Sequence, residues 1–182
     1  DRYVDYLLKL ASSEDKDTDT KAAAVLALRW CQDIPAAAAA VAAAAESSDP
    51  CIRATGITAL ATSDPRKATS LSDRWLNSDD GRRLANEAFM TPEVACFSWV
   101  VYCASKEATE KVVNNWLRAK DSTWARSTAL ECIIGRSDLP FKEQMRDVRP
   151  LCDHDLLKSQ AHIALACSGD PRSAEWCIAN LG

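Results

Sequence analysis

A short pattern that recurs along the chain constrains its fold more than any other feature. In each copy a basic residue is followed by a small residue three positions later, by another at six and by an apolar residue at seven. Spacings of three and four residues put side chains on one face of an α-helix, so each copy predicts a helix with a small-residue face that a neighbouring helix can approach closely. The five copies are Lys21-Ala24-Ala27-Leu28, Arg53-Gly56-Ala59-Leu60, Arg82-Ala85-Ala88-Phe89, Arg126-Ala129-Cys132-Ile133 and Lys158-Ala161-Ala164-Leu165.

Signals for helix starts surround these copies. An acidic or polar residue about four positions ahead of each copy can cap the helix and complement its dipole. These residues are Asp17, Asp49, Ser78, Ser122 and His154. A short break and a second helix follow four of the copies, and the breaks at Asp64-Pro65 and Asp170-Pro171 carry a strong start signal. We expect second helices over residues 36–46, 66–77, 141–151 and 172–181, with Ile34-Pro35 and Leu139-Pro140 at the other two breaks.

The longer interval between Arg82 and Arg126 predicts additional helices. A short helix is expected over residues 82–90, followed by helices over 93–105 and 106–119. The stretch from Ala68 to Asp80, which contains Trp75, is similar to the stretch from Ala108 to Asp121, which contains Trp116. This similarity indicates one irregular repeat. At the start of the chain we expect a helix over residues 3–11 and a polar loop over 12–20.

Together these patterns predict an all-α chain of about twelve helices with no strand. The expected architecture is an α-α superhelix, or solenoid, of about five stacked helical hairpins with one irregular repeat near residues 80–120. Residues 1–182 are expected to form a single repeat domain that is part of a longer chain. No apolar run approaches the roughly 20 residues that a membrane-spanning helix needs. The expected repeats cover residues 17–46, 49–78, 79–119, 121–151 and 153–181.

One of these segments resembles a known family. The segment Ser48-Asp49-Pro50-Cys51-Ile52-Arg53-Ala54-Thr55-Gly56-Ile57-Thr58-Ala59-Leu60 is similar to the first helix of HEAT and HEAT-like repeats of the PBS-lyase type, and His154 to Leu165 is a weaker copy. The resemblance implies an armadillo-like superhelix in which Asp49 and Arg53 link neighbouring units. It carries no activity with it. The tryptophans at equivalent places, Trp75 and Trp116, are expected to pack between repeats.

Cysteine and histidine usage gives no metal or cofactor site. Eight cysteines are spread along the chain, and several, such as Cys103 and Cys132, lie inside apolar helical patterns. We interpret them as buried free thiols in a cytoplasmic protein, with a disulfide framework as the alternative. There is no Cys-x-x-Cys motif, and His154 and His162 lie more than two helical turns apart. We therefore expect no metal and no cofactor.

The sequence offers no convincing catalytic centre. It contains no nucleophile elbow, no phosphate-binding glycine loop and no His-Glu-x-x-His motif. The alternative function is that of a HEAT-like DNA-binding enzyme of the alkylpurine DNA glycosylase type, to which Trp99, Trp124 and Arg126 give a faint likeness. A formal net charge of −4 argues against it, because sequence-independent affinity for nucleic acid needs clustered Lys and Arg.

The remaining interpretation is a non-catalytic scaffold or adaptor for protein–protein interaction. In solenoids the second helices usually line the concave surface, and here their polar residues are rich in Lys and Arg. We expect this face to bind another protein, through an acidic segment; an ordinary solvated face is the alternative. The candidate partner-binding residues are Arg66, Lys67, Arg74, Lys111, Asn115, Arg118, Lys142, Arg146, Arg149 and Arg172.

Overall fold

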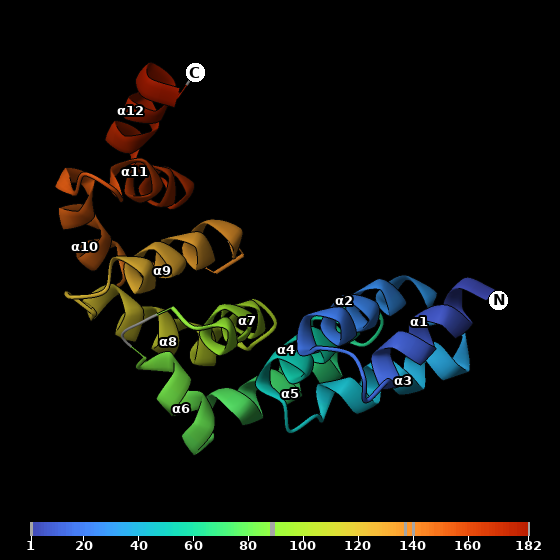
Figure 1. The fold of residues 1–182 in the computed structure, drawn as a ribbon. Coiled ribbons are helices and arrows are strands. Elements are labelled where there is room, and N and C mark those ends of the chain that lie inside the picture. Colours follow the sequence, from blue (N-terminus) through green and yellow to red (C-terminus); the bar gives the residue numbers. More distant parts are fainter. Residues whose placement is uncertain (1, 88–89, 137, 140, 182) are drawn as a thin grey trace. The chain divides into compact units, whose positions relative to one another are not determined.

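The structure is a computed structural model that describes residues 2–87, 90–136, 138–139 and 141–181. These residues form α-helices, two short 3-10 helices and no β-strand (Figure 1), so the all-α prediction is confirmed. Within the described ranges no helix is long and apolar enough to cross a membrane. The α-helices are α1 (Arg2–Ser12), α2 (Thr18–Leu28), α3 (Pro35–Ala45), α4 (Pro50–Leu60), α5 (Pro65–Leu76), α6 (Asp79–Ala85), α7 (Pro92–Val101), α8 (Lys106–Arg118), α9 (Thr123–Gly135), α10 (Met145–Val148), α11 (Lys158–Cys167) and α12 (Pro171–Leu181); the 3-10 helices are η1 (Arg29–Cys31) and η2 (Arg149–Asp153).

Side-chain caps explain where most of these helices begin. Asp17 accepts a hydrogen bond from the Thr20 amide at 2.7 Å, and Asp49 accepts from the amides of Cys51 and Ile52 at 2.9 and 3.1 Å. Both carboxylates satisfy amide groups that the first helical turn leaves unpaired. The other predicted caps follow the same rule: Ser78 accepts from Gly81, Ser122 from Ala125, Asp64 from Lys67 and Asp170 from Ser173.

The fifth predicted cap is wrong. His154 lies one turn ahead of α11, which begins at Lys158 after Leu157, and its ring Nδ1 accepts a hydrogen bond from the Leu156 amide at 3.3 Å. The imidazole therefore closes a turn between η2 and α11. The residue directly before α11 is Leu157, which has no side-chain group that can cap the helix.

Three expected boundaries also need correction. The polar loop ends earlier than expected, because Asp17 caps a helix that starts at Thr18. The short helix predicted over residues 82–90 covers Asp79–Ala85 instead, because the Ser78 cap precedes it directly; Ala88 and Phe89 lie outside the described residues. The helix expected over residues 141–151 is reduced to α10 and η2. Phe141 has a φ of 31°, a left-handed conformation that cannot start an α-helix, and the Pro140 break lies outside the described residues.

The described chain divides into two compact units: Asp1–Leu84 with Thr91–Ser105, and Ala85–Met90 with Lys106–Gly182. In the first unit α4 is the central helix and packs against α2, α3, α5 and α7. Its residues are buried on almost every face; Ala54, Gly56 and Ile57 are among them. The expectation of a single repeat domain over 1–182 stays a prediction.

The small-residue face of α4 has a direct structural use. A Cβ atom added at Gly56 would lie 2.2 Å from the backbone nitrogen of Ala45 and 2.5 Å from the carbonyl carbon of Ala44, both in α3. Glycine is therefore the residue that lets the two helix backbones approach this closely. The alanine-rich sequence of α3 serves the same contact, since Ala44 and Ala45 are buried against α4.

In the second unit, α9 packs against α8 and α11, and α11 packs against α12 and η2. The buried core includes Ala129, Leu130 and Ile133 of α9 together with Ala161 and Leu165 of α11. The first helices of two successive predicted hairpins thus contact each other through their small-residue faces. In the first unit α2 and α4 make the same kind of contact.

Candidate functional site

All ten residues expected to bind a partner are exposed, and they divide between the two units. Three of them, Arg66, Lys67 and Arg74, lie on α5 in the first unit. The other seven belong to the second unit. They are Lys111, Asn115 and Arg118 on α8, Lys142 before α10, Arg146 on α10, Arg149 in η2 and Arg172 on α12.

Four of the arginines in this set form ion pairs: Arg146 pairs with Asp147 on its own helix at 3.5 Å, and the other three pair with carboxylates of other elements. Arg74 pairs with Glu46, the C-cap residue of α3, at 2.9 Å in the first unit. In the second unit Arg118 pairs with Asp147 on α10 at 3.2 Å, and Arg149 pairs with Asp170 ahead of α12 at 2.8 Å. The hydrogen bond from Arg149 lowers the pKa of Asp170 to about 2. These pairs join elements predicted to be second helices, so the three positive charges are partly neutralised within the chain.

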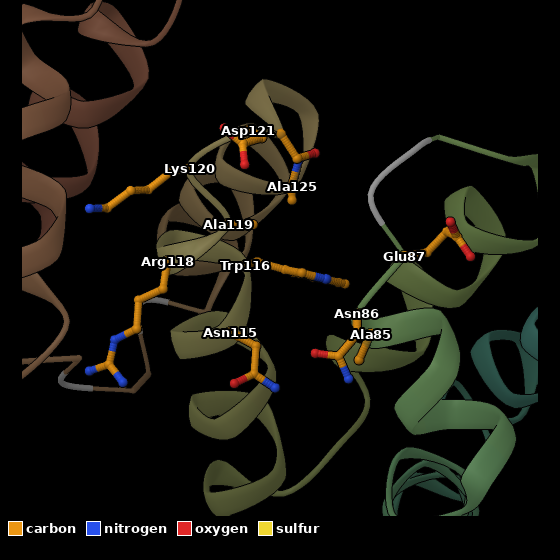
Figure 2. Close-up of a pocket in the computed structure, with 11 residues that line it drawn as sticks. Ala85, Asn86, Glu87, Asn115, Trp116, Arg118, Ala119, Lys120, Asp121 and Ala125 are labelled. Carbon is orange, nitrogen blue, oxygen red and sulfur yellow. The ribbon is translucent and has the colours of Figure 1, made fainter.

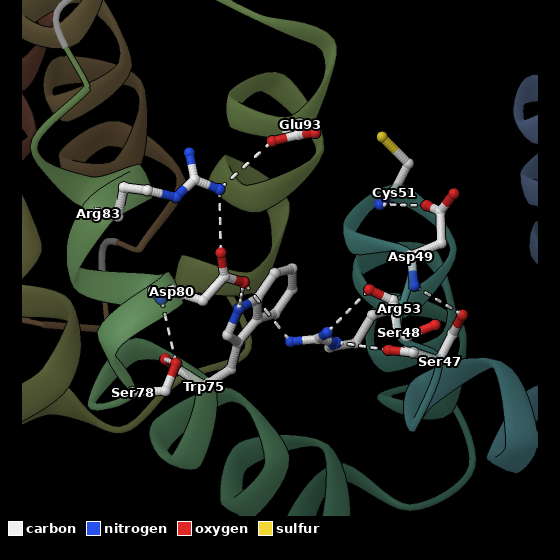
Figure 3. A network of polar contacts seen from close by, with 11 residues as sticks. Ser47, Ser48, Asp49, Cys51, Arg53, Trp75, Ser78, Asp80, Arg83 and Glu93 are labelled. Atoms are coloured by element: carbon white, nitrogen blue, oxygen red, sulfur yellow. Dashed lines mark hydrogen bonds and ion pairs between the residues drawn. The ribbon is translucent and has the colours of Figure 1, made fainter.

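Arg53 lies at the centre of a polar network in the first unit (Figure 3). Its guanidinium donates hydrogen bonds to the carbonyl oxygens of Ser47 and Ser48, at 2.7 and 3.2 Å, and lies 4.6 Å from the centroid of the Trp75 ring. It is also 3.7 Å from the carboxylate of Asp80. Arg53 therefore connects the loop before α4, the end of α5 and the start of α6.

The Trp75 indole completes this network. Its Nε1–H donates to the Asp80 carboxylate at 3.0 Å, and its ring packs edge-on against Phe97. Burial raises the pKa of Asp80, but hydrogen bonds from Trp75 and Arg83 and the charges of Arg83 and Arg53 outweigh this effect, so the pKa lies below its ordinary value. Asp80 is thus held as a carboxylate that satisfies both the indole and the guanidinium groups.

Trp116 holds the equivalent sequence position in the second unit, but its indole N–H is not satisfied in this way. The residue is 1% exposed, its ring packs edge-on against Trp124, and its Nε1 has no hydrogen-bond partner among the described residues. A buried donor without a partner costs free energy, so this atom needs an explanation.

A pocket of about 510 Å³ lies beside this indole (Figure 2). We call it the Trp116 pocket; residues 85–87, 115–116, 118–122 and 125 line it, all of them in the second unit. The Trp116 indole extends from α8 towards Ala85 and Asn86, whereas Arg118 and Lys120 extend away from it (Figure 2). Two predicted partner-binding residues, Asn115 and Arg118, therefore lie at this pocket.

The start of the next helix explains why the two tryptophans differ. Ser78 caps α6 directly after α5, so Asp80 lies in the first turn of α6, within reach of Trp75. In the second unit the capping serine is Ser122, and Asp121 precedes the helix. Asp121, the counterpart of Asp80, therefore lies before α9 and not in its first turn. The matching sequences around Trp75 and Trp116 did not predict the pocket, although the different places of the two caps could have indicated it.

In the part of the chain that the structure describes, the histidines and cysteines are not gathered into a metal-binding cluster. No group of three or more His, Cys, Asp and Glu side chains that could hold a metal ion occurs within the described ranges. His162 stacks on Trp176 with ring centroids 4.0 Å apart, and its Nδ1 lies 3.3 Å from Ser173 Oγ. Burial, followed by the charge of Lys158, lowers the pKa of His162. All eight cysteines, each in the described part of the chain, are free thiols.

The residues that gave a faint likeness to DNA glycosylases belong to different units. Trp99 lies on α7 in the first unit and is 45% exposed, while Trp124 and Arg126 lie on α9 in the second unit. Comparison of the whole chain with protein-family models, with curated proteins and with solved structures finds no match.

Proposed function

We propose that the chain is a HEAT-like α-solenoid that acts as a non-catalytic scaffold, binding another protein on the face formed by its second helices. Hairpins with repeated caps and close contacts between successive first helices support the solenoid. The ion pairs that join second helices support it too, because they hold neighbouring hairpins in register. In such a stack the second helices form one extended surface.

One observation carries the binding proposal: the Trp116 pocket opens beside α8, a second helix whose exposed residues Lys111, Asn115 and Arg118 were expected to contact a partner. Its volume of about 510 Å³ falls in the range typical of ligand pockets. Buried aromatic residues with polar neighbours are the usual centres of protein interfaces. The exposed basic residues around the pocket suit a partner segment that carries acidic side chains.

The eight free thiols support a reducing compartment, in the cytoplasm, for this scaffold. Thiols stay reduced there, whereas oxidising compartments favour disulfides.

The proposal is tested by affinity capture with a charge-reversed bait. Lys111→Glu with Lys142→Glu reverses two exposed charges in the second unit and breaks no ion pair described above. We expect the variant to recover any specifically captured partner at least about tenfold less than the wild type, because rim charges steer and hold an oppositely charged segment. Recovery is quantified by mass spectrometry.

A matched control carries two reversals elsewhere. Lys9→Glu with Lys16→Glu changes the net charge by the same amount at exposed positions of α1 and the loop that follows it. This control should capture the partner as the wild type does. Equal loss in both variants would contradict the proposal, because it would reflect net charge and not the face of the second helices.

A further inference from the structure

A second pocket, of about 470 Å³, lies among α1, α2, α3 and the start of α4, within the first unit. Of the described residues that line it, Lys21 is the one with a charge, and the others are apolar except for two serines. Small-molecule sites have this volume and this composition, an apolar wall with a few polar groups that fix orientation. We call it the Lys21 pocket; its lining includes Leu8, Lys21, Val25, Ala40, Ala44 and Ile52.

The next hairpin of the same unit has an equivalent pocket, of about 260 Å³, which Arg53 and Trp75 help to line. Arg53 is the fourth residue of α4, as Lys21 is the fourth residue of α2. Trp75 is the last residue but one of α5, and Ala44 is the last but one of α3. The two pockets are therefore equivalent sites in successive hairpins. An indole stands at the wall of the smaller one, and a methyl group stands at the same place in the larger one.

The contacts of Arg53 show which chemistry completes a site of this kind (Figure 3). Its guanidinium carbon lies 4.6 Å from the centroid of the Trp75 ring, and one of its nitrogens lies 3.7 Å from the Asp80 carboxylate. The indole N–H donates to that same carboxylate at 3.0 Å. A cation at this place in the first helix is thus matched by an aromatic ring and an anion that lie side by side.

Lys21 has neither of these partners. Its side chain is only partly exposed, and its ammonium group makes no ion pair or hydrogen bond with the residues that the structure describes. The nearby carboxylate of Asp49 caps α4, accepts a hydrogen bond from Thr18 Oγ1 at 3.2 Å and is not part of the pocket lining. An ammonium group that is partly withdrawn from water gains most from an ionised acceptor. The Lys21 pocket therefore combines an unpaired cation with an apolar wall.

We propose that the Lys21 pocket binds a small aromatic carboxylate, a property separate from the proposed scaffold function. The ring lies against the alanines of α3, at the place that Trp75 takes in the next hairpin, and the carboxylate accepts from Lys21 Nζ. Leu8 and Ile52, which are both partly exposed, contact the ring from α1 and α4. A neutral ring would leave the ammonium group unpaired, and an aliphatic acid would lack the flat face that Trp75 presents in the equivalent site.

The test is isothermal titration calorimetry of the full chain with three probes: indole-3-acetate, its neutral amide indole-3-acetamide, and cyclohexylacetate. Indole-3-acetate is expected to bind with a Kd below about 1 mM. The amide is expected to bind about tenfold more weakly, because it loses the charge-assisted hydrogen bond. Cyclohexylacetate is expected to bind about fivefold more weakly, because it has no aromatic face. Shifts of the methyl resonances of Val25 and Ile52 in the ¹³C-labelled chain locate the bound probe.

Variants separate the role of the site from its stability. Lys21→Gln is expected to weaken indole-3-acetate about tenfold and to leave indole-3-acetamide unchanged. Ala44→Trp introduces the residue that α5 has at the equivalent place, and it should abolish binding of all three probes. Lys9→Gln, at an exposed position of α1 in the same unit, is the matched control and should change nothing. Because Lys21 is partly exposed, its replacement keeps the test valid even where Ala44→Trp fails to fold.

Each contrary outcome overturns the inference in a different way. Equal affinity for indole-3-acetate and its amide would show that Lys21 holds no anion. Cyclohexylacetate binding as tightly as indole-3-acetate would indicate a site for aliphatic acids. If only a capped Trp–Glu dipeptide shifts the Ile52 resonance, the pocket takes side chains of a partner, and if no probe shifts it, the pocket holds only water. The capture experiment with Lys111→Glu and Lys142→Glu concerns the second unit, so it tests the scaffold function independently of all these results.

Discussion

The guanidinium of Arg53 covers the ring of Trp75, with 4.6 Å between the guanidinium carbon and the ring centroid. The two residues come from α4 and α5, and both contact the Asp80 carboxylate, which α6 positions. This carboxylate satisfies the Trp75 indole within the chain, whereas the Trp116 indole N–H has no hydrogen-bond partner among the described residues. The same sequence feature therefore has a satisfied indole in the first unit and an unpaired one in the second.

Arg53→Ala is predicted to lower the free energy of unfolding of the first unit by about 2 kcal/mol, since it removes a cation–π contact and two hydrogen bonds to loop carbonyls. Urea unfolding followed by circular dichroism measures the change. Arg66→Ala, at an exposed position of α5, is the control and should change stability by less than about 0.5 kcal/mol. Equal stability of the two variants would show that the network contributes nothing.

Gly56→Ala is predicted to destabilise the first unit by about 2 kcal/mol, although alanine favours helices over glycine. The new Cβ would meet the backbone of α3, which can relieve the overlap only by moving away from α4. Gly169→Ala is the comparison: its φ is 90° and nothing lies within 4 Å of an added Cβ, so it carries backbone strain alone, about 1 kcal/mol. Thermal unfolding should rank Gly56→Ala as the more damaging change, and the reverse order would refute the close approach of α3 and α4.

The sequence predicted features that depend on contacts within one helical turn better than features that depend on contacts between helices. Asp17, Asp49 and Ser122 cap their helices as expected, because a cap is a contact within one helical turn. The contact between Arg53 and Trp75 joins two helices, so its partners could not be paired from spacing alone, even though both residues were identified as structural. The backbone at Phe141 depends on tertiary packing that no helix propensity encodes.

The candidate site was predictable only in part. The exposure of Asn115 and Arg118 follows from their position on the polar side of α8, but the orphaned indole between them does not. It depends on where the following helix starts relative to Asp121, a difference of a few residues from the arrangement at Asp80. Helix boundaries of that precision are the least reliable output of sequence patterns.

The Cys51 thiol is predicted to resist alkylation in the folded chain. Burial, followed by the hydrogen bond with Cys96, raises its pKa to about 12, so almost no thiolate is present at pH 8. Cys167 is exposed and provides the internal reference. Mass spectrometry after brief iodoacetamide treatment at pH 8 should find Cys167 modified and Cys51 intact. Similar modification of both would mean that Cys51 is not buried against α7.

His162 is predicted to titrate below its ordinary pKa of 6.5, because burial against Trp176 disfavours the charged ring. The unfolded chain then binds more protons in the pH range between the lowered value and 6.5, so stability falls as pH decreases through that range and is recovered above it. Following the ring resonances of His162 by NMR gives the pKa directly. His162→Gln should flatten the pH dependence of stability between pH 7 and 5; a pKa above 6.5 would contradict the packing described for α11 and α12.

Chemical footprinting of lysines in the captured complex tests the central claim most directly. The chain is acetylated alone and with its partner bound, and the reactivity of each lysine is compared by mass spectrometry. Lys111 and Lys142, on the face assigned to the partner, should become several-fold less reactive in the complex, while Lys9 and Lys16 stay unchanged. Protection confined to Lys9 and Lys16, with Lys111 and Lys142 as reactive as in the free chain, would place the partner elsewhere and contradict the account.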